Sequence, residues 1–437
     1  MFTQKYGEKR AMLNSFFYLE PYVHSDLIDN QILLHNTINS ITSTFLFKGI
    51  KGVEFISRLL KDDVNRITLL DENELIDDEI TAFIVLCRDY FHGDLIESHY
   101  RPLILPFAPK LNFDVNNINN DKTWQTLNLR YSLKEVFIYY GDSSTNITDS
   151  AFNTSGSKQI NAPIINLNEA QYESSNLVLR FFRGEAFPGL RKVQLYGNEI
   201  SLKKIKDTCD FFKDCFVHYN AYISDAVIEL LDNKTLTYTE NLKFILWVDF
   251  KTERKLLFDF FSMNEDSISR IVFKIIIRDV NDISDLEQIF ITQGITYELI
   301  PFIDNSTSNA LFEVIKSNKA DVENQSLTHR EIASRLFINH LSFGKLFILP
   351  NGDVHANLNM PHIGNIKSNK LIEILRNAHT IEDSSWYLTR AKVEPCKNCV
   401  YRYLCQPISS YELYFGIMNL CNYDPVKKTW QDNDKTE

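Results

Sequence analysis

Glycine is scarce in this chain: 14 glycines are spread over 437 residues, so few segments have the composition of a flexible linker. The sequence contains no G-x-G-x-x-G run and no G-x-x-x-x-G-K-[ST] run, which removes the usual signals of a dinucleotide site and of a P-loop. A G-x-S-x-G nucleophile motif is missing as well. The common glycine-dependent signatures of catalysis are therefore absent.

Long apolar runs and dense basic clusters are missing too. No run of about 18 apolar residues is present, so we expect no membrane span. The N-terminal residues lack the apolar core of a signal peptide, and we expect a cytoplasmic protein. The net charge is −11 without a dense cluster of lysine and arginine, which argues against nucleic acid and anionic membrane as partners. A peptide or protein partner is compatible with this charge.

The seven cysteines are unevenly distributed. Four of them form a C-x2-C-x5-C run followed by one more cysteine: Cys396, Cys399, Cys405 and Cys421. In a reducing compartment this cluster predicts a metal site before it predicts disulfides, because two thiolates in a tight turn and two from nearby loops complete fourfold coordination. The spacing also fits a structural zinc ion, and buried free cysteines are a further alternative. The other three are predicted core residues: Cys87, Cys209 and Cys215.

The N-terminal part predicts a small α+β unit over residues 14–97, after a loose tail at 1–13. Strands are expected at 16–24, 31–37 and 41–48, and helices at 52–60 and around a stripe formed by Ile80, Phe83, Ile84, Cys87 and Phe91. A winged-helix-like domain fits this order of elements. His24 and His35 lie on the first two strands and are interpreted as strand-surface histidines.

The middle part shows a strand–helix rhythm over residues 131–304, after a proline-punctuated connector at 98–130. Strands are expected at 133–140, 177–182, 192–197, 215–222, 242–250, 270–277 and 297–303, with helices between most of them. This repeat is typical of an α/β parallel sheet or barrel. A linker at 305–330, a helix at 331–338 and a hairpin turning at Asn351-Gly352 complete the chain up to the cysteine run.

The segment EPCKNCVYRYLCQPISSYELYFGIMNLC resembles the C-terminal SPASM domain of radical-SAM peptide maturases, here within 331–430. The resemblance implies that the four clustered cysteines hold one auxiliary cluster of the 4Fe-4S type. A second auxiliary cluster needs further cysteines, but Ser409 and Asn357 stand at two of their positions, and no cysteine lies between 216 and 395. We therefore expect one metal centre, with structural zinc as the alternative.

The middle block resembles a degenerate radical-SAM partial (β/α) barrel. Members of that family carry C-x3-C-x2-C after the first strand, but residues 139–156 contain no cysteine, so no S-adenosylmethionine cluster is expected. Gly197, Asn198 and Glu199 resemble a remnant of the family's glycine-rich motif. A polar turn at a strand end explains the same three residues.

The opening FFYLEPYVH and LLHNT resemble the pseudo-radical-SAM/SPASM proteins of Bacteroidales-type peptide natural-product (RiPP) systems. That resemblance implies an accessory role in peptide maturation. The block 14–97 is also similar to the small leader-peptide-recognition domains of peptide-modifying systems, with the strand Ile41–Lys48 as its candidate binding edge and the helix Glu79–Phe91 beside it. The candidate peptide contacts are Ile41, Phe45, Phe47 and Phe83. Taken residue by residue, the aromatic side chains are also well explained as core.

Together these features predict an α/β protein with a small N-terminal winged-helix-like domain, a degenerate radical-SAM barrel and a SPASM domain with one metal site. The resemblance to the pseudo-radical-SAM/SPASM proteins implies the function, which is that of a non-catalytic accessory protein that binds a precursor peptide, docks an active radical-SAM maturase, or does both. Two alternatives stay open: an iron–sulfur electron-transfer partner of a maturase, and an enzyme with repurposed barrel chemistry that uses Glu199.

Overall fold

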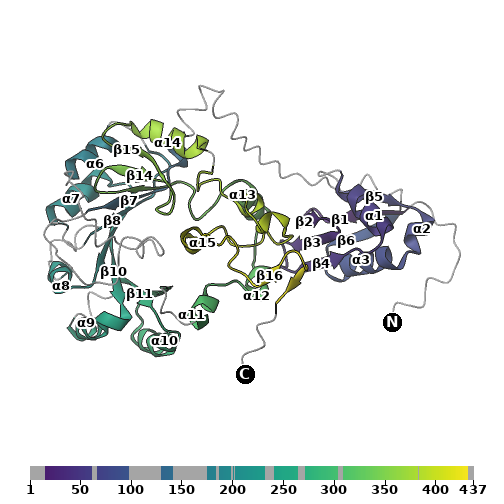
Figure 1. Cartoon of the computed structure of the whole chain (residues 1–437), viewed down its shortest axis with the longest axis horizontal. Coiled ribbons are helices and arrows are strands. Elements are labelled where there is room, and N and C mark those ends of the chain that lie inside the picture. The colour runs from purple at the N-terminus through teal and green to yellow at the C-terminus, as the bar shows by residue number, and fades with distance from the viewer. Residues whose placement is uncertain are drawn as a thin grey trace.

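The computed structural model describes residues 15–61, 66–97, 129–140, 175–183, 187–197, 200, 202–231, 241–263, 271–303, 309–381 and 383–431. Within these residues the protein is mixed α/β, with one nine-stranded, mostly parallel sheet and small antiparallel sheets. Figure 1 shows an N-terminal unit on one side, the large sheet on the other, and C-terminal elements between them.

The N-terminal unit contains two three-stranded antiparallel sheets. One has the order β2–β3–β4, with bounds Val23–Ile28, Gln31–Asn36 and Thr42–Leu46. The other has the order β5–β1–β6, with bounds Ile67–Leu70, Ser15–Leu19 and Gly93–Glu97. The helices are α1 (Ile50–Leu60), α2 (Glu72–Leu75) and α3 (Asp78–Asp89).

Two expectations for this unit were wrong in detail. The strand predicted over 16–24 is two strands, β1 and β2, because the chain turns between Leu19 and Val23 and Pro21 lies within that turn. Phe91 does not extend the buried stripe of α3: it lies past the helix end with a positive φ of 58°, and its side chain is 67% exposed. The third strand and both helices form where they were predicted.

The large sheet carries six parallel strands in sequential order, followed at one edge by β13 and an antiparallel hairpin. The parallel strands are β7 (Glu135–Tyr139), β8 (Lys192–Tyr196), β9 (Phe216–Tyr222), β10 (Leu242–Asp249), β11 (Ile271–Ile277) and β12 (Tyr297–Pro301). Next to β7 lies β13 (Lys345–Ile348), which is parallel to it, then β14 (Asp353–His355) and β15 (His362–Asn365). Positive φ at Gly352 permits the predicted turn between β13 and β14.

Helices connect the parallel strands: α6 (Ser175–Phe182), α7 (Leu202–Phe211), α8 (Asp225–Leu231), α9 (Phe250–Met263) and α10 (Asn281–Gln293). The strand predicted at 177–182 is wrong, since this segment is α6. Val178 and Phe182 are four residues apart and both buried, so the apolar run follows a helical period rather than that of a strand.

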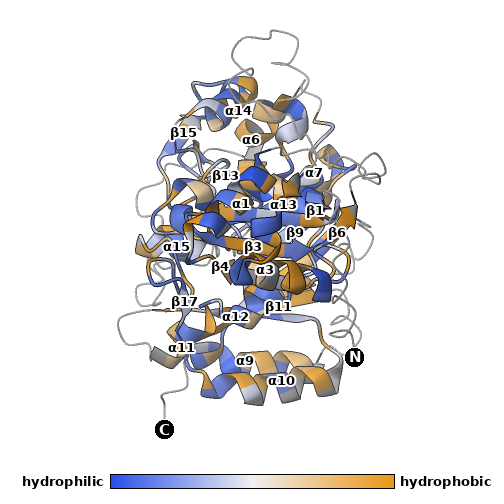
Figure 2. Cartoon of the chain, turned by 90° about the vertical axis from the view of Figure 1, so that its right-hand side faces the viewer, coloured by the Kyte–Doolittle hydropathy of each residue, from blue (hydrophilic) through white to orange (hydrophobic). Residues whose placement is uncertain are grey.

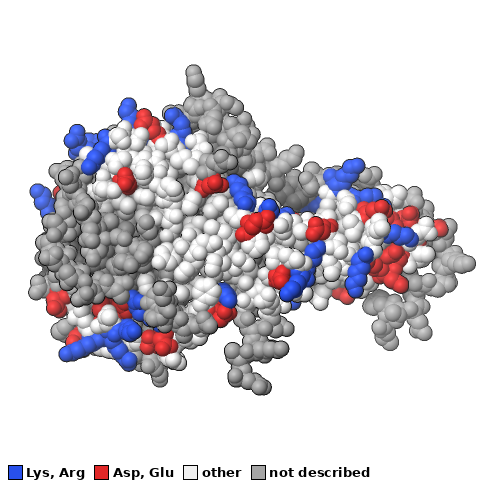
Figure 3. Space-filling model, in the orientation of Figure 1, with Lys and Arg blue, Asp and Glu red and all other residues white. Residues whose placement is uncertain are grey.

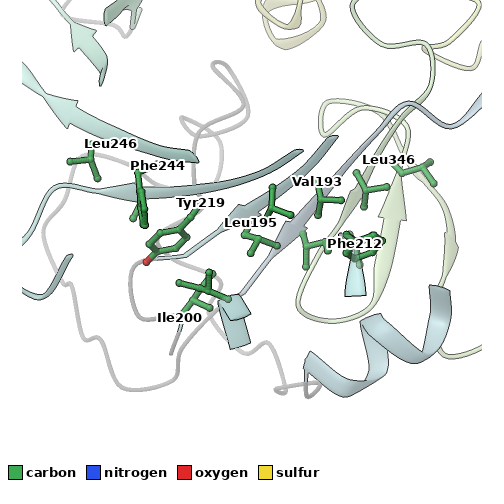
Figure 4. Packing of buried hydrophobic residues seen from close by; sticks show 14 of the residues in the cluster. Val193, Leu195, Ile200, Phe212, Tyr219, Phe244, Leu246 and Leu346 are labelled. Atoms are coloured by element: carbon green, nitrogen blue, oxygen red, sulfur yellow. The ribbon is translucent and has the colours of Figure 1, made fainter. Parts of the chain in front are cut away.

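The two faces of the large sheet differ in chemistry. The face covered by the helices, called the outer face, is mainly aliphatic with aromatic residues among them, and Figure 4 shows Val193, Leu195, Phe244 and Leu246 in its core. The opposite, inner face is aromatic, with Phe137, Tyr139, Tyr196, Tyr222, Trp247 and Phe347 among its members. Tyr411 of the C-terminal segment packs against the inner face and donates a hydrogen bond to the Pro301 carbonyl.

Within the described residues, the C-terminal segment contributes five short helices. They are α11 (Asn309–Val314), α12 (Lys319–Glu323), α13 (His329–Phe337), α14 (Leu371–Thr380) and α15 (Ser410–Phe415). Of these, α12, α13 and α15 lie between the N-terminal unit and the large sheet, while α11 and α14 pack against the large sheet (Figure 1). A two-stranded pair, β16 (Tyr423–Asp424) and β17 (Thr429–Trp430), follows. The polar stretch expected to be a linker at 305–330 thus contains α11 and α12, and its Asn318 and Thr328 cap helices.

The surface is chemically mixed. Figure 2 shows apolar and polar residues alternating along α9 and α10, as expected for helices with one buried side. On the face in Figure 3, basic and acidic side chains are interspersed over the N-terminal unit. None of the described helices combines the length and apolarity needed to cross a bilayer.

Buried His379 on α14 gives a prediction on acid stability. Its ring contacts the hydroxyls of Tyr387 and Ser132, and burial lowers its pKa to about 4. In the unfolded chain this imidazole is protonated below about pH 6.5, whereas in the folded chain it stays neutral down to about pH 4. The free energy of unfolding therefore falls by roughly 1.4 kcal/mol per pH unit as the pH drops from about 6.5 toward 4. Denaturant unfolding followed by tryptophan fluorescence should show a pH slope smaller by about this amount in His379→Gln. An unchanged slope would contradict the assignment of His379 as a neutral buried group.

Candidate functional site

The four clustered cysteines are positioned by tight turns. Cys396 begins a 3-10 turn, and the Cys399 amide donates to the Cys396 carbonyl at 3.0 Å, which places both thiols on one short turn. The following loop is closed by a hydrogen bond of 2.9 Å, which the Cys405 amide donates to the Tyr401 carbonyl. Cys421 arrives from the end of the chain, where it forms an isolated parallel bridge with Ser317.

The thiols lie close enough together to act on each other's ionisation. Burial raises the pKa of Cys405 to about 12; Arg390 opposes this shift, and Cys421 and Cys396 add to it. Burial likewise raises the pKa of Cys399, with Cys405 as the next cause. None of the cysteines in the structure is in a disulfide.

Two arginines bring positive charge to the cysteine cluster. The guanidinium of Arg390 donates to the Cys396 sulfur at 3.5 Å and is paired with Glu412 at 2.9 Å. Arg335 donates to the carbonyls of Leu404 and Cys405. These contacts suit a centre formed by thiolates, because cations near sulfur favour the deprotonated form that binds metal.

The donor set therefore fits a metal centre by its chemistry: four neighbouring thiols on two chain segments with cationic hydrogen-bond donors beside them. As the side chains stand, no group of three or more histidine, cysteine, aspartate or glutamate side chains in the described part of the chain is arranged to hold a metal ion. The two residues that stand in place of ligands for a second cluster, Ser409 and Asn357, have structural roles. Ser409 caps α15, and Asn357 is buried and accepts from the Asn359 amide.

The sheet β2–β3–β4 is packed directly on the segment 396–421 with the four cysteines, called the cysteine segment. Its residues alternate strictly between two covered faces, since paired residues of antiparallel strands point the same way. One face enters the core of the N-terminal unit through Ile32, Leu34 and Phe47. The other face, called the docking face, contacts residues between 323 and 423, which include the cysteine segment. The contacting residues of this face are His24, Asp26, Ile28, Gln31, Leu33, His35, Thr42 and Thr44.

Several partners of the docking face come from the five residues between Cys399 and Cys405, called the docking loop (400–404). Completely buried Leu33 shares one hydrophobic cluster with Cys399 and Leu404. Arg402 pairs with Asp26 at 2.8 Å, with both side chains largely buried. Burial raises the pKa of Asp26 to about 6, although the guanidinium of Arg402 opposes that shift.

The two strand histidines are not on a solvent surface as predicted. His35 is completely buried, and the ring of His24 packs edge-on against Tyr403 at 5.9 Å between centroids. Burial lowers the pKa of His24 to about 3 and that of His35 to about 4. The alternation of polar and apolar residues predicted a solvated strand face, but the cysteine segment covers that face.

The outer edge of β4 carries free backbone groups. Bonds of Asn36 to Ile41 and of Phe47 to Asn30 fix the ladder, so the odd-numbered residues of β4 bond to β3. The N–H and C=O groups of Thr42, Thr44 and Leu46 therefore point away from β3, and no described strand pairs with them.

Helix α3 lies along β4. The carboxylate of Glu79, at the start of α3, accepts from the Gly49 amide at 3.0 Å, and Phe83 meets Phe45 with ring centroids 5.4 Å apart. Just past the helix end, His92 contacts the Ser43 hydroxyl at 3.0 Å. The helix thus runs antiparallel to β4 beside its length.

The predicted peptide contacts divide into two groups. Phe47 and Phe83 are completely buried, so they belong to the core, which was the alternative interpretation, and they cannot touch a peptide in this structure. Phe45 and Ile41 are partly exposed. Of the four residues, the latter two remain candidates for direct contact.

The predicted remnant of the radical-SAM motif is only partly visible. Gly197 has a φ of 153°, and a Cβ there would lie 2.6 Å from the Tyr140 carbonyl, so close packing of the ends of β7 and β8 explains the glycine. Asn198, Glu199 and residues 141–156 lie outside the described residues.

The inner face of the large sheet contains polar residues that sequence reasoning missed. Gln194 donates to Glu135 at 2.8 Å, Asn220 donates to Gln194 at 2.8 Å, and the Trp247 indole donates to Asn220 at 3.3 Å. This ladder crosses four neighbouring strands. Single polar residues at alternate strand positions were the available signal, but their partners are strands apart in sequence.

A second missed group lies at the carboxyl end of β10. Asp249 is paired with Arg278 at 2.9 Å, and its amide donates to Glu253 at 2.8 Å. Burial raises the pKa of Glu253 to about 7; the bond from the Asp249 amide lowers it, and the Asp249 carboxylate raises it further.

No protein-family model matches this chain, and no curated protein matches it. A function for this chain is therefore inferred from the chemistry and geometry of its own residues.

The ion pair between Arg402 and Asp26 gives a prediction on docking. A double-mutant cycle with Asp26→Asn and Arg402→Gln should give a coupling energy of about 1–3 kcal/mol, because the pair is buried and each single change strands one polar partner. The exposed pair Arg88–Asp94, at 2.9 Å, is the control and should give less than about 0.5 kcal/mol. Chemical unfolding measures both; equal coupling in the two pairs would contradict a close-packed docking face.

Proposed function

We propose that this chain is a non-catalytic relative of the radical-SAM peptide maturases, which binds a ribosomally made precursor peptide along the free edge of β4. In this proposal it is a cytoplasmic accessory protein, and an active radical-SAM maturase is its partner enzyme. The single observation that carries the proposal is the unpaired edge of β4 with α3 aligned beside it.

An extended peptide can add to such an edge as a further strand. Its backbone would bond with the outward groups of Thr42, Thr44 and Leu46, and its alternate side chains would meet either α3 or the docking-face side. Apolar side chains are exposed at both ends of β4: Ile38 before it, Leu46 as its last residue and Ile50 after it, with 73%, 41% and 79% of their surface exposed. We therefore expect apolar residues in the bound part of the peptide.

The radical chemistry itself is assigned to the partner. The first parallel strand β7 is followed by a stretch without cysteine, since no cysteine occurs between 88 and 208. Three thiolates are needed there to hold the cluster that cleaves S-adenosylmethionine. The six sequential parallel strands, joined by five helices in the described residues, support a degenerate partial barrel as the scaffold. Turnover of a precursor peptide by the chain alone would contradict this assignment, and Glu253 would then be the first residue to substitute.

The cysteines are proposed to hold one metal centre through Cys396, Cys399, Cys405 and Cys421, as a 4Fe-4S cluster or a structural zinc ion. When bound, such a centre would hold together the turn at Cys396, the docking loop and the segment around Cys421, which pairs with Ser317. Metal binding of this kind contributes free energy directly to folding. The proposed role of the centre is therefore structural.

Serine at Cys399 or Cys405 is expected to remove metal from the anaerobically purified chain, because three thiols no longer complete the fourfold site. Elemental analysis with acid-labile sulfide measures this and separates iron–sulfur from zinc. Cys209→Ser is the control, since Cys209 is buried in the core of the large sheet. Equal metal contents in all these chains would contradict the proposed site.

Proline at Leu46 is expected to reduce peptide capture at least about tenfold, since it removes an outward N–H without breaking a bond to β3. Leu69→Pro is the matched control: Leu69 lies on the edge strand β5, is 45% exposed, and also points its N–H away from its neighbour. Each chain serves as bait in extract of the native host, and mass spectrometry quantifies the captured peptides. An equal loss in both variants, or in neither, would count against the β4 edge.

A further inference from the structure

We propose that metal loading of the four cysteines and formation of the peptide-binding edge are coupled through the docking loop. The inference rests on the proposed function, because it concerns the regulation of the β4 edge. The geometry that points to it is the position of the loop. The loop is flanked by the proposed ligands Cys399 and Cys405, and its side chains pack against the docking face of the sheet β2–β3–β4.

The side chains of the docking loop contact other parts of the protein rather than solvent. Val400, Tyr401 and Leu404 are each no more than 2% exposed, and all three belong to the cluster that contains Leu33. Arg402 reaches Asp26 of β2. The loop is thus as much a part of the N-terminal sheet as of the cysteine cluster.

A chain of hydrogen bonds continues from the loop to the free edge. The Tyr401 hydroxyl donates to the Glu323 carboxylate at 2.6 Å, and the Glu323 carbonyl accepts from the Thr42 hydroxyl at 2.9 Å. The Thr42 oxygen lies 2.9 Å from Nδ1 of His35 on β3, so His35 donates there. Thr42 is one of the three residues whose backbone groups face outward from β4.

The physical reason for coupling is the loss of chain freedom. Fixing both ends of a short loop removes conformations that would otherwise compete with the docked one. A three-stranded sheet is stable only when its apolar surface is covered. When the loop is released, Leu33 and the polar groups beside it lose their partners, and the edge strand β4 frays first.

Hydrogen exchange on the full chain tests the coupling without any peptide. Amides of β3 and β4 should exchange at least about tenfold faster after the metal is removed by a chelator, and likewise in Cys399→Ser. The strands β9, β10 and β11 of the large sheet are the internal control and should not change. Unchanged exchange in β3 and β4 despite a confirmed loss of metal would overturn the proposal.

Coupling is reciprocal, so a change in the sheet should act on the metal. Leu33→Ala is expected to speed metal release to a chelator several-fold, while Leu34→Ala, the same truncation one residue on, should have a smaller effect. Both leucines are at most 1% exposed, but Leu34 faces the core of the N-terminal unit. Equal release rates in the two variants would overturn the proposal, because the effect would then not pass through the docking face.

The outcomes separate this inference from the proposed function. If the metal protects β4 but Leu46→Pro does not reduce peptide capture, the coupling stands and the peptide edge falls. If the wild-type chain binds no metal, the coupling falls, while the comparison of Leu46→Pro with Leu69→Pro still decides on the peptide edge.

Discussion

The contact between the docking face and the docking loop is the constraint on which the rest of the structure depends. Completely buried Leu33, the ion pair of Asp26 with Arg402 and the bond from Tyr423 to Gln31 join residues almost 400 positions apart. Because both faces of β2–β3–β4 are largely covered, its edge strands are left for recognition, and β4 is the edge strand that α3 accompanies. The cysteine segment also contacts the inner face of the large sheet through Tyr411, so it connects the N-terminal unit with the large sheet.

Period and composition were sufficient for much of the fold. The strand–helix rhythm predicted all six parallel strands from β7 to β12, and the pair Asn351-Gly352 predicted the β13–β14 hairpin. The prediction failed at 177–182, where six residues were too few to separate a buried helix from a strand. It failed again at His24 and His35, because polar residues at alternate positions give the same pattern for a solvated face and for an interface whose partners come from a distant segment.

The candidate site shows the same division. The spacing of the four cysteines was readable, because ligands of one centre lie close in sequence. Arg390, Glu412 and the ladder from Glu135 to Trp247 were not, because their pairing depends on how distant elements meet. Phe47 and Phe83 were ambiguous for another reason: an aromatic residue on a strand or helix follows the same period in a core as at a binding surface, and only packing distinguishes the two.

The strict alternation in β3 has a consequence for how this protein can be divided. Residues 15–97 look like a separable module in the sequence, yet one half of the side chains in β3 belongs to a partner supplied by residues 317–430. Excised alone, that unit would present a bare leucine amid unsatisfied polar groups next to an open strand edge, which is the combination that drives self-association. Recombination of this region with another scaffold would therefore have to carry the cysteine-bearing end of the chain with it.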